Sequence, residues 1–65
     1  HDLTAEIGER VMETYKGYTI THVAKVTRYD QMFWIINLEG MKDFVVVRIA
    51  GDDMDEIQHI EKPEN

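Results

Sequence analysis

The chain has no cysteine, no serine and only one proline in 65 residues. Without cysteine it can form neither disulfides nor thiol nucleophiles, although this does not fix its compartment, because exported domains also occur without cysteine. Serine, the other common nucleophile, is missing as well. Threonine, histidine and aspartate are present, but their spacing indicates no catalytic triad, and so small a domain has little room for a substrate pocket. We therefore expect a protein that is not an enzyme and has no cofactor.

Long hydrophobic runs are also missing, and basic residues are few. The longest apolar stretches have the length of a strand, so no membrane span is expected. Thirteen acidic against seven scattered basic side chains give a net charge of −6, which argues against nucleic acid as a partner. The first residue is His1 rather than methionine, so we expect a processed form, a trimmed chain or a fragment.

An amphipathic helix is predicted over positions 3–16. Its apolar residues recur at every fourth position: Leu3, Ile7, Val11 and Tyr15. This spacing gives a helix one buried face. Asp2 or Thr4 can cap its start, and Gly17 is a typical residue for its end.

Four strands are predicted after the helix. They cover positions 18–28, 32–38, 43–50 and 55–61. The first departs from strict alternation, so we expect a bulge or an irregular start near His22. The links at 29–31, 39–42 and 51–53 are short and suit antiparallel neighbours. The predicted fold is α+β: one N-terminal helix packed on a four-stranded antiparallel meander (α-β-β-β-β). It forms a single domain over residues 1–65, with frayed ends at 1–2 and 62–65, where Pro63 stops the ladder.

The central strands carry large apolar side chains on both faces, since side chains alternate along a strand. The second strand divides into Met32, Trp34, Ile36 and Leu38 on one face and Phe33, Ile35 and Asn37 on the other. The third divides into Val45, Val47 and Ile49 against Phe44, Val46, Arg48 and Ala50. One helix covers only one face. We therefore expect the other to be covered by a second copy in a homodimer, a swapped helix or a segment outside this sequence.

Four residues are candidates for binding a protein partner: Phe33, Trp34, Phe44 and Arg48. Aromatic residues and arginine are enriched at the energetic centres of interfaces. For any single aromatic in so small a domain, a place in the core is the alternative. Phe33 and Trp34 are adjacent in the chain, so they point to opposite faces.

Metal binding is weakly indicated. The densest carboxylate cluster is Asp52, Asp53, Asp55 and Glu56. Close oxygen ligands suit a hard cation such as Ca²⁺, but the spacing does not match an EF-hand loop, and a solvated acidic turn is the favoured interpretation. His22 and His59 have no zinc-ligand motif beside them, so we interpret them as ordinary strand histidines and expect no metal site.

The order of elements resembles the PepSY and PepSY-like domains. The resemblance lies in a helix followed by Tyr15-Lys-Gly-Tyr-Thr-Ile20, an aromatic strand Met32-Phe-Trp-Ile-Ile36, then Phe44-Val-Val-Val-Arg-Ile49 and an acidic turn. In that family a Tyr-x-Gly-Tyr/Ala-x-Ile junction leads from the helix into the strands. The turn Ala50-Gly-Asp-Asp-Met54 stands where the family more usually has Asp-x-x-Gly.

The PepSY-like resemblance implies an extracytoplasmic bacterial domain, periplasmic or secreted, that binds and restrains a protease or another protein partner. It brings no catalytic residues. Cystatins share the helix-on-sheet architecture, but their Gln-x-Val-x-Gly loop is absent here. A cystatin-like protease inhibitor and a structural homodimerisation module are the alternative functions.

Overall fold

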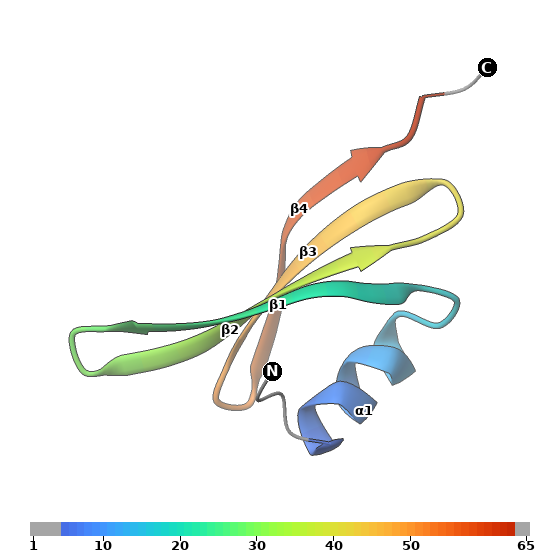
Figure 1. Ribbon diagram of the computed structural model, residues 1–65. Helices are drawn as coiled ribbons and strands as arrows, with labels where there is room; N and C mark the ends of the chain where they lie inside the picture. Colours follow the sequence, from blue (N-terminus) through green and yellow to red (C-terminus); the bar gives the residue numbers. More distant parts are fainter. Residues whose placement is uncertain (1–4, 64–65) are drawn as a thin grey trace.

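The structure is a computed structural model, and it describes residues 5–63. Helix α1 (Ala5–Thr14) precedes strands β1 (Thr19–Arg28), β2 (Gln31–Glu39), β3 (Asp43–Ala50) and β4 (Asp53–Glu61). The strands form one antiparallel sheet in the order β1-β2-β3-β4, so each pairs with its neighbour in sequence (Figure 1). The predicted α-β-β-β-β fold is confirmed. No helix in the described range is long and apolar enough to span a membrane.

The helix ends two residues before the predicted boundary. The amide of Tyr15 still donates to the carbonyl of Val11 (2.8 Å), and Tyr18 donates to the carbonyl of Tyr15 (3.2 Å). Gly17 has a φ of +88°, a left-handed conformation that glycine adopts without a steric penalty. It therefore turns the chain from α1 into β1, as predicted. The predicted capping residues Asp2 and Thr4, like the ends predicted to fray at 1–2, lie outside the described residues.

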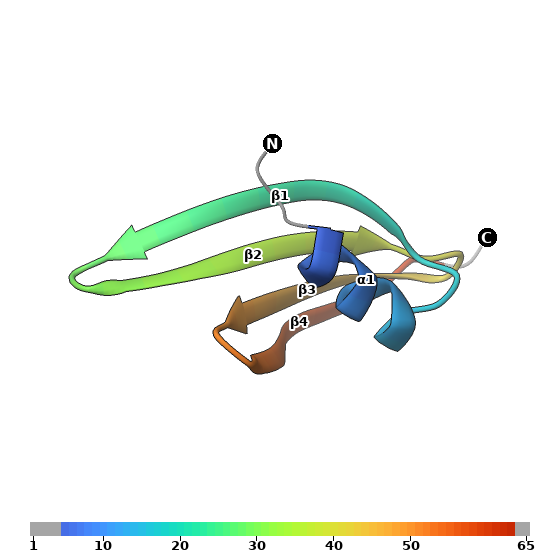
Figure 2. The same cartoon turned by 90° about the horizontal axis from the view of Figure 1, so that it is seen from below.

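The core lies between α1 and one face of the sheet, which we call the helix face (Figure 2). Among residues 5–63, its buried members are Val11, Trp34, Ile36, Leu38, Val45, Val47 and Ile49. Six of the seven come from alternate positions of the two central strands, and the helix supplies only Val11. The alternation predicted for these strands therefore selects the side chains that α1 covers.

Two bulges interrupt the ladders. The register between β1 and β2 shifts between Ile20 and His22, which confirms the predicted irregularity near His22. A second shift, which the sequence did not predict, lies at Val46/Val47 of β3, where Ile57 is the extra residue on β4. Ile57 is 51% exposed. A bulge increases the local twist of the strand that carries it.

The β1–β2 hairpin projects beyond the rest of the sheet (Figures 1 and 2). Pairing between β2 and β3 starts at Trp34 with Ile49, so the preceding residues of β2 have only β1 beside them. At its tip Tyr29 is 93% exposed and has a φ of 58°. Few residues other than glycine, asparagine and aspartate adopt such a conformation.

The C-terminal part has a longer strand than predicted. Strand β4 starts at Asp53 rather than at position 55. Lys62 was expected to fray, but its amide donates to the carbonyl of Lys42 (2.8 Å) and its ammonium lies 2.7 Å from Glu39 Oε2. Lys62 thus contacts both β2 and the link between β2 and β3, and the sequence analysis predicted neither contact. Residues 64–65 lie outside the described range.

Candidate functional site

The face of the sheet opposite α1 has no covering element among the described residues, and we call it the uncovered face. Cross-strand partners share a face, so the pairing assigns its members. Its apolar side chains are Ala24, Val26, Phe33, Ile35, Phe44, Val46, Ala50 and Ile60. Phe44 is 40% exposed and Ile60 is 49% exposed, and the two are cross-strand partners. An apolar surface of this kind is available to a partner.

Each aromatic ring on the uncovered face is accompanied by a cation and a carboxylate. The guanidinium carbon of Arg48 lies 6.0 Å from the centre of the Phe33 ring, while Arg48 Nη2 donates to Asp55 Oδ2 (2.9 Å). The ammonium of Lys62 lies 4.9 Å from the centre of the Phe44 ring and 2.7 Å from Glu39 Oε2. Cations over aromatic faces are favourable, and their stems shield apolar surface from water.

Charge on the uncovered face is balanced. Its basic residues are Arg28, Arg48 and Lys62, and its acidic residues are Glu39, Asp53 and Asp55. The formal sum is therefore zero, whereas the whole chain carries −6. Among the described residues, the excess negative charge therefore lies on other surfaces, so the uncovered face does not repel an apolar partner of low charge.

The structure brings together three of the four predicted partner-binding residues. Phe33, Phe44 and Arg48 share the uncovered face, and Arg48 is 45% exposed at its side chain. Trp34 lies on the helix face and is only 6% exposed, so it belongs to the core in this chain. The alternation of β2 dictates this split, because neighbouring residues point to opposite faces.

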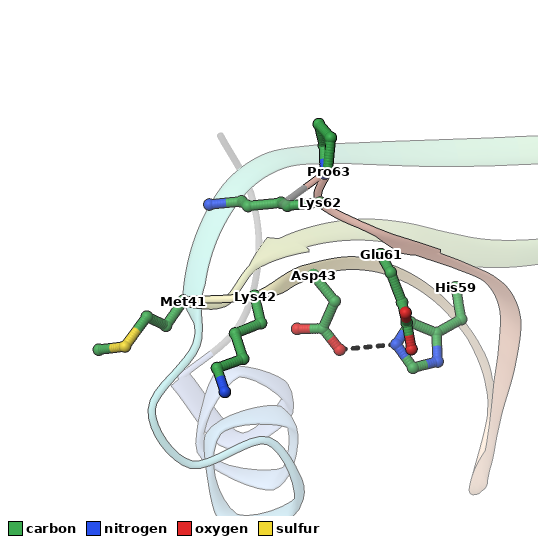
Figure 3. A pocket seen from close by; sticks show the side chains of 7 residues that line it. All are labelled: Met41, Lys42, Asp43, His59, Glu61, Lys62 and Pro63. Carbon is green, nitrogen blue, oxygen red and sulfur yellow. Dashed lines mark hydrogen bonds and ion pairs between the residues drawn. The ribbon is translucent and has the colours of Figure 1, made fainter. Parts of the chain in front are cut away.

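A polar cluster lies on the helix face beside α1. Tyr18 Oη donates to Asp43 Oδ2 (2.9 Å). The same carboxylate oxygen lies 2.6 Å from His59 Nε2, and Figure 3 draws this contact between Asp43 and His59. On the other side of the ring, His59 Nδ1 is 3.6 Å from Glu56 Oε2. Tyr15 Oη donates to Glu56 Oε1 (3.0 Å). The cluster thus connects the end of the helix to the last two strands.

These contacts change proton affinities. The hydrogen bond from Tyr18, followed by that from His59, lowers the pKa of Asp43. The bond to Asp43 raises the pKa of Tyr18. Partial burial, together with the hydrogen bond to Glu56, raises the pKa of Tyr15 to about 12. Hydrogen bonds that favour one protonation state shift a pKa toward that state.

Both ring nitrogens of His59 are occupied by contacts within the cluster. A general base needs a ring nitrogen aimed at a substrate proton, but each ring nitrogen of His59 faces a carboxylate. An open groove of about 780 Å³ lies beside it (Figure 3). The groove is lined by Met41, Lys42, Asp43, His59, Glu61, Lys62 and Pro63. The geometry fits a structural tie between the helix and the sheet.

The carboxylates of the acidic turn do not all point toward one site. Asp55 is paired with Arg48 on the uncovered face, while Glu56 accepts from Tyr15 on the helix face. Among the described residues, no three histidine, aspartate or glutamate side chains are placed to hold a metal ion. His22 lies on the uncovered face of β1, opposite Asn37 and apart from His59.

Sequence reasoning missed the partners of Tyr18 and Lys62. Beside the Tyr18–Asp43 contact the structure places Gly40, which is buried. A Cβ at Gly40 would lie 2.7 Å from Tyr18 Cε2 and 2.8 Å from Asp43 Oδ1. The absence of a side chain there therefore permits the tyrosine and the carboxylate to meet.

Comparison of the chain with protein-family models, with curated proteins and with solved structures gave no match.

Proposed function

We propose that this chain is a protein-binding module and that the uncovered face is its binding surface. One observation carries the proposal: Phe33, Phe44 and Arg48, which belong to the residue types that dominate interface energetics, lie together on a face that no described element covers. Antiparallel sheets with one solvated face usually alternate apolar and polar residues. Here both faces of β2 and β3 are largely apolar.

The chemistry of the face defines the kind of partner. Its formal charge is zero, so a polyanion or a strongly basic protein would gain little there. A partner with an apolar, weakly charged protein surface would bury Phe44 and Ile60, which are 40% and 49% exposed. The pairs Arg48–Asp55 and Lys62–Glu39 would form polar contacts around this centre.

The biological setting is part of the same proposal. The element order around Tyr15-Lys-Gly-Tyr-Thr-Ile20 is similar to that of PepSY-like domains, and it supports an extracytoplasmic module that binds a protease or another exported protein. On this proposal the module acts by occupying its partner rather than by catalysis.

Site-specific photocrosslinking tests the proposal. A photoreactive phenylalanine analogue would replace Phe44 on the uncovered face or, as a control, the exposed Thr14 at the end of α1. The chain would be irradiated with the exported proteins of its source, and the products identified by mass spectrometry. We expect one defined protein to be linked from position 44 and not from position 14.

Two outcomes would contradict the proposal. Equal labelling from both positions would show that the uncovered face is not selective. If position 44 is linked only to a second copy of the chain, homodimerisation through the uncovered face would replace the proposed binding function. Either result would be meaningful only with circular dichroism spectra that match those of the wild type.

A further inference from the structure

The two edges of the sheet have opposite charge. Strands β1 and β4 are the edge strands, and no described segment pairs with their outer sides. An edge strand presents free backbone N–H and C=O groups that can pair with another strand. The pattern of charge on the two edges therefore determines which strand can pair there.

Strand β1 is basic within an acidic molecule. It contains Lys25 and Arg28 and, of the four strands in the described part of the chain, it alone has no acidic residue. Neither cation has an ion-pair partner among the described residues: Lys25 lies 5.9 Å from the centre of the Trp34 ring, and Arg28 is exposed near the hairpin tip. Two β1 edges would repel each other.

Strand β4, in contrast, is acidic. It carries no lysine or arginine, and its acidic residues are Asp53, Asp55, Glu56 and Glu61. Asp53 and Glu61 have no ion-pair partner among the described residues, while Asp55 and Glu56 are engaged with Arg48 and Tyr15. Two β4 edges would also repel each other, whereas β4 and β1 attract.

We infer that the β1 edge binds the β4 edge of a second copy of this chain. In the meander β4 runs opposite to β1, so the added strand continues an antiparallel ladder with both α1 helices on the same side of the sheet. One register places Lys25 opposite Glu56 on the helix face and Arg28 opposite Asp53 on the other face. The same register therefore allows both ion pairs, because the two residues of each pair lie on the same face of the ladder.

The contact is heterologous, since it joins two different edges. A pair of copies keeps one free β4 edge and one free β1 edge, so association continues from copy to copy rather than stopping at a dimer. The ion pairs are exposed, and the chains share a charge of −6, so association is weak and sensitive to salt. This assembly uses the strand edges and leaves the centre of the uncovered face accessible.

A charge-swap experiment tests this inference. Sedimentation equilibrium of the wild-type chain at rising concentration should show a growing average mass that falls when salt is added. Lys25→Glu/Arg28→Glu and Asp53→Lys/Glu56→Lys should each weaken association at least about tenfold, because like charges then face each other. An equimolar mixture of the two variants should associate again, since each acidic edge then meets a basic one.

Two controls separate edge pairing from other effects. Lys16→Glu/Lys42→Glu changes the net charge by the same amount as Lys25→Glu/Arg28→Glu, but at exposed positions outside both edges, and should leave association as in the wild type. The two single variants Arg28→Glu and Asp53→Arg, alone and mixed, test the same exchange of charge at one ion pair. They leave Glu56 in place, whose substitution would remove the hydrogen bond from Tyr15. Circular dichroism confirms that each variant is folded.

Amide spectra distinguish the surfaces. Concentration-dependent shifts confined to β1 and β4, with rescue in the mixture, would support edge pairing. Shifts centred on Phe33, Phe44 and Arg48 would overturn it and assign self-association to the uncovered face. A wild-type chain that stays monomeric up to millimolar concentration, or a mixture that fails to associate, would overturn it as well while leaving the proposed binding function intact.

Discussion

Asp43 lies between Tyr18 and His59: its Oδ2 accepts a hydrogen bond from Tyr18 Oη at 2.9 Å and is 2.6 Å from His59 Nε2. These contacts link the segment after α1 to β3 and β4. They lower the pKa of Asp43, so the folded state releases this proton more readily than the unfolded chain. The resulting stabilisation is present above the ordinary aspartate pKa and is lost as the pH falls through the lowered value.

Removal of the Tyr18 hydroxyl should weaken the stabilisation that comes from the lowered pKa of Asp43. In Tyr18→Phe the pKa of Asp43 should rise toward its ordinary value, because the largest cause of its lowering is gone. Stability should then depend less steeply on pH in the acidic range. Carbon-detected titration of the Asp43 carboxyl measures the first effect and urea unfolding at several pH values the second. An unchanged Asp43 titration would contradict the hydrogen bond.

Alkaline conditions should loosen the other end of the cluster. Partial burial and the bond to Glu56 raise the pKa of Tyr15 from 10.0 to about 12. A raised tyrosine pKa stabilises the fold below pH 10, and this contribution is lost between pH 10 and about 12, where only the unfolded chain has released the proton. Unfolding curves over this range should show the decline in the wild type and a smaller one in Tyr15→Phe.

Tyr29→Phe is the matched control for this experiment. Tyr29 is 93% exposed at the hairpin tip and has no acidic partner among the described residues. Removal of the Tyr29 hydroxyl should not change stability, so the loss of stability at alkaline pH should equal that of the wild type. A decline that disappears in Tyr29→Phe but persists in Tyr15→Phe would refute the assignment.

Adjacent isoleucines on β2 should differ sharply in their effect on stability. Ile36 is completely buried on the helix face, whereas Ile35 is half-buried on the uncovered face. Ile36→Ala should cost about 2–5 kcal/mol by leaving a cavity. A chain of this size has a total stability of roughly 3–10 kcal/mol, so the variant should be close to unfolding at room temperature.

Ile35→Ala should cost about 1 kcal/mol or less, because water already reaches its site and no closed cavity forms. Chemical unfolding of both variants provides the comparison. Equal losses would show that the uncovered face is as well packed as the helix face, most simply because a second copy covers it.

The fold followed from patterns that are local in sequence. Four-residue periodicity located α1, and two-residue alternation located β2 and β3 together with the split between Phe33 and Trp34. Glycine at position 17 marked the end of the helical region through its positive φ. The broken alternation before His22 marked the first bulge. In each case the physical cause lies within a few residues of the feature.

The choice of the helix face and the polar cluster depends on contacts distant in sequence. Val11 of α1 packs on the face that contains Trp34 rather than Phe33, and both faces of β2 are apolar enough for either choice. Tyr18 and Asp43 are 25 residues apart, and Lys62 and Glu39 are 23 residues apart. No periodicity connects such pairs, so they emerge only when the register of the sheet is known.

Relief of strain at the hairpin tip should stabilise the protein. Tyr29 adopts a φ of 58°, which costs a residue with a Cβ about 1–2 kcal/mol. Tyr29→Gly should therefore raise the free energy of unfolding by about 0.5–1 kcal/mol, the strain relieved being partly offset by the greater freedom of glycine in the unfolded chain. Thermal unfolding measures the change. A lower melting temperature would show that the Tyr29 ring makes a stabilising contact.

The binding surface is tested most directly by calorimetric titration of the crosslinked partner, once purified, with four forms of the chain. These are the wild type, Phe44→Ala, Arg48→Ala and the control Glu13→Ala on the exposed side of α1. Loss of an interface anchor should weaken binding by at least about tenfold in Phe44→Ala and Arg48→Ala. Glu13→Ala should bind like the wild type. Wild-type affinity in both uncovered-face variants, with all four chains folded, would contradict the proposed role of the uncovered face.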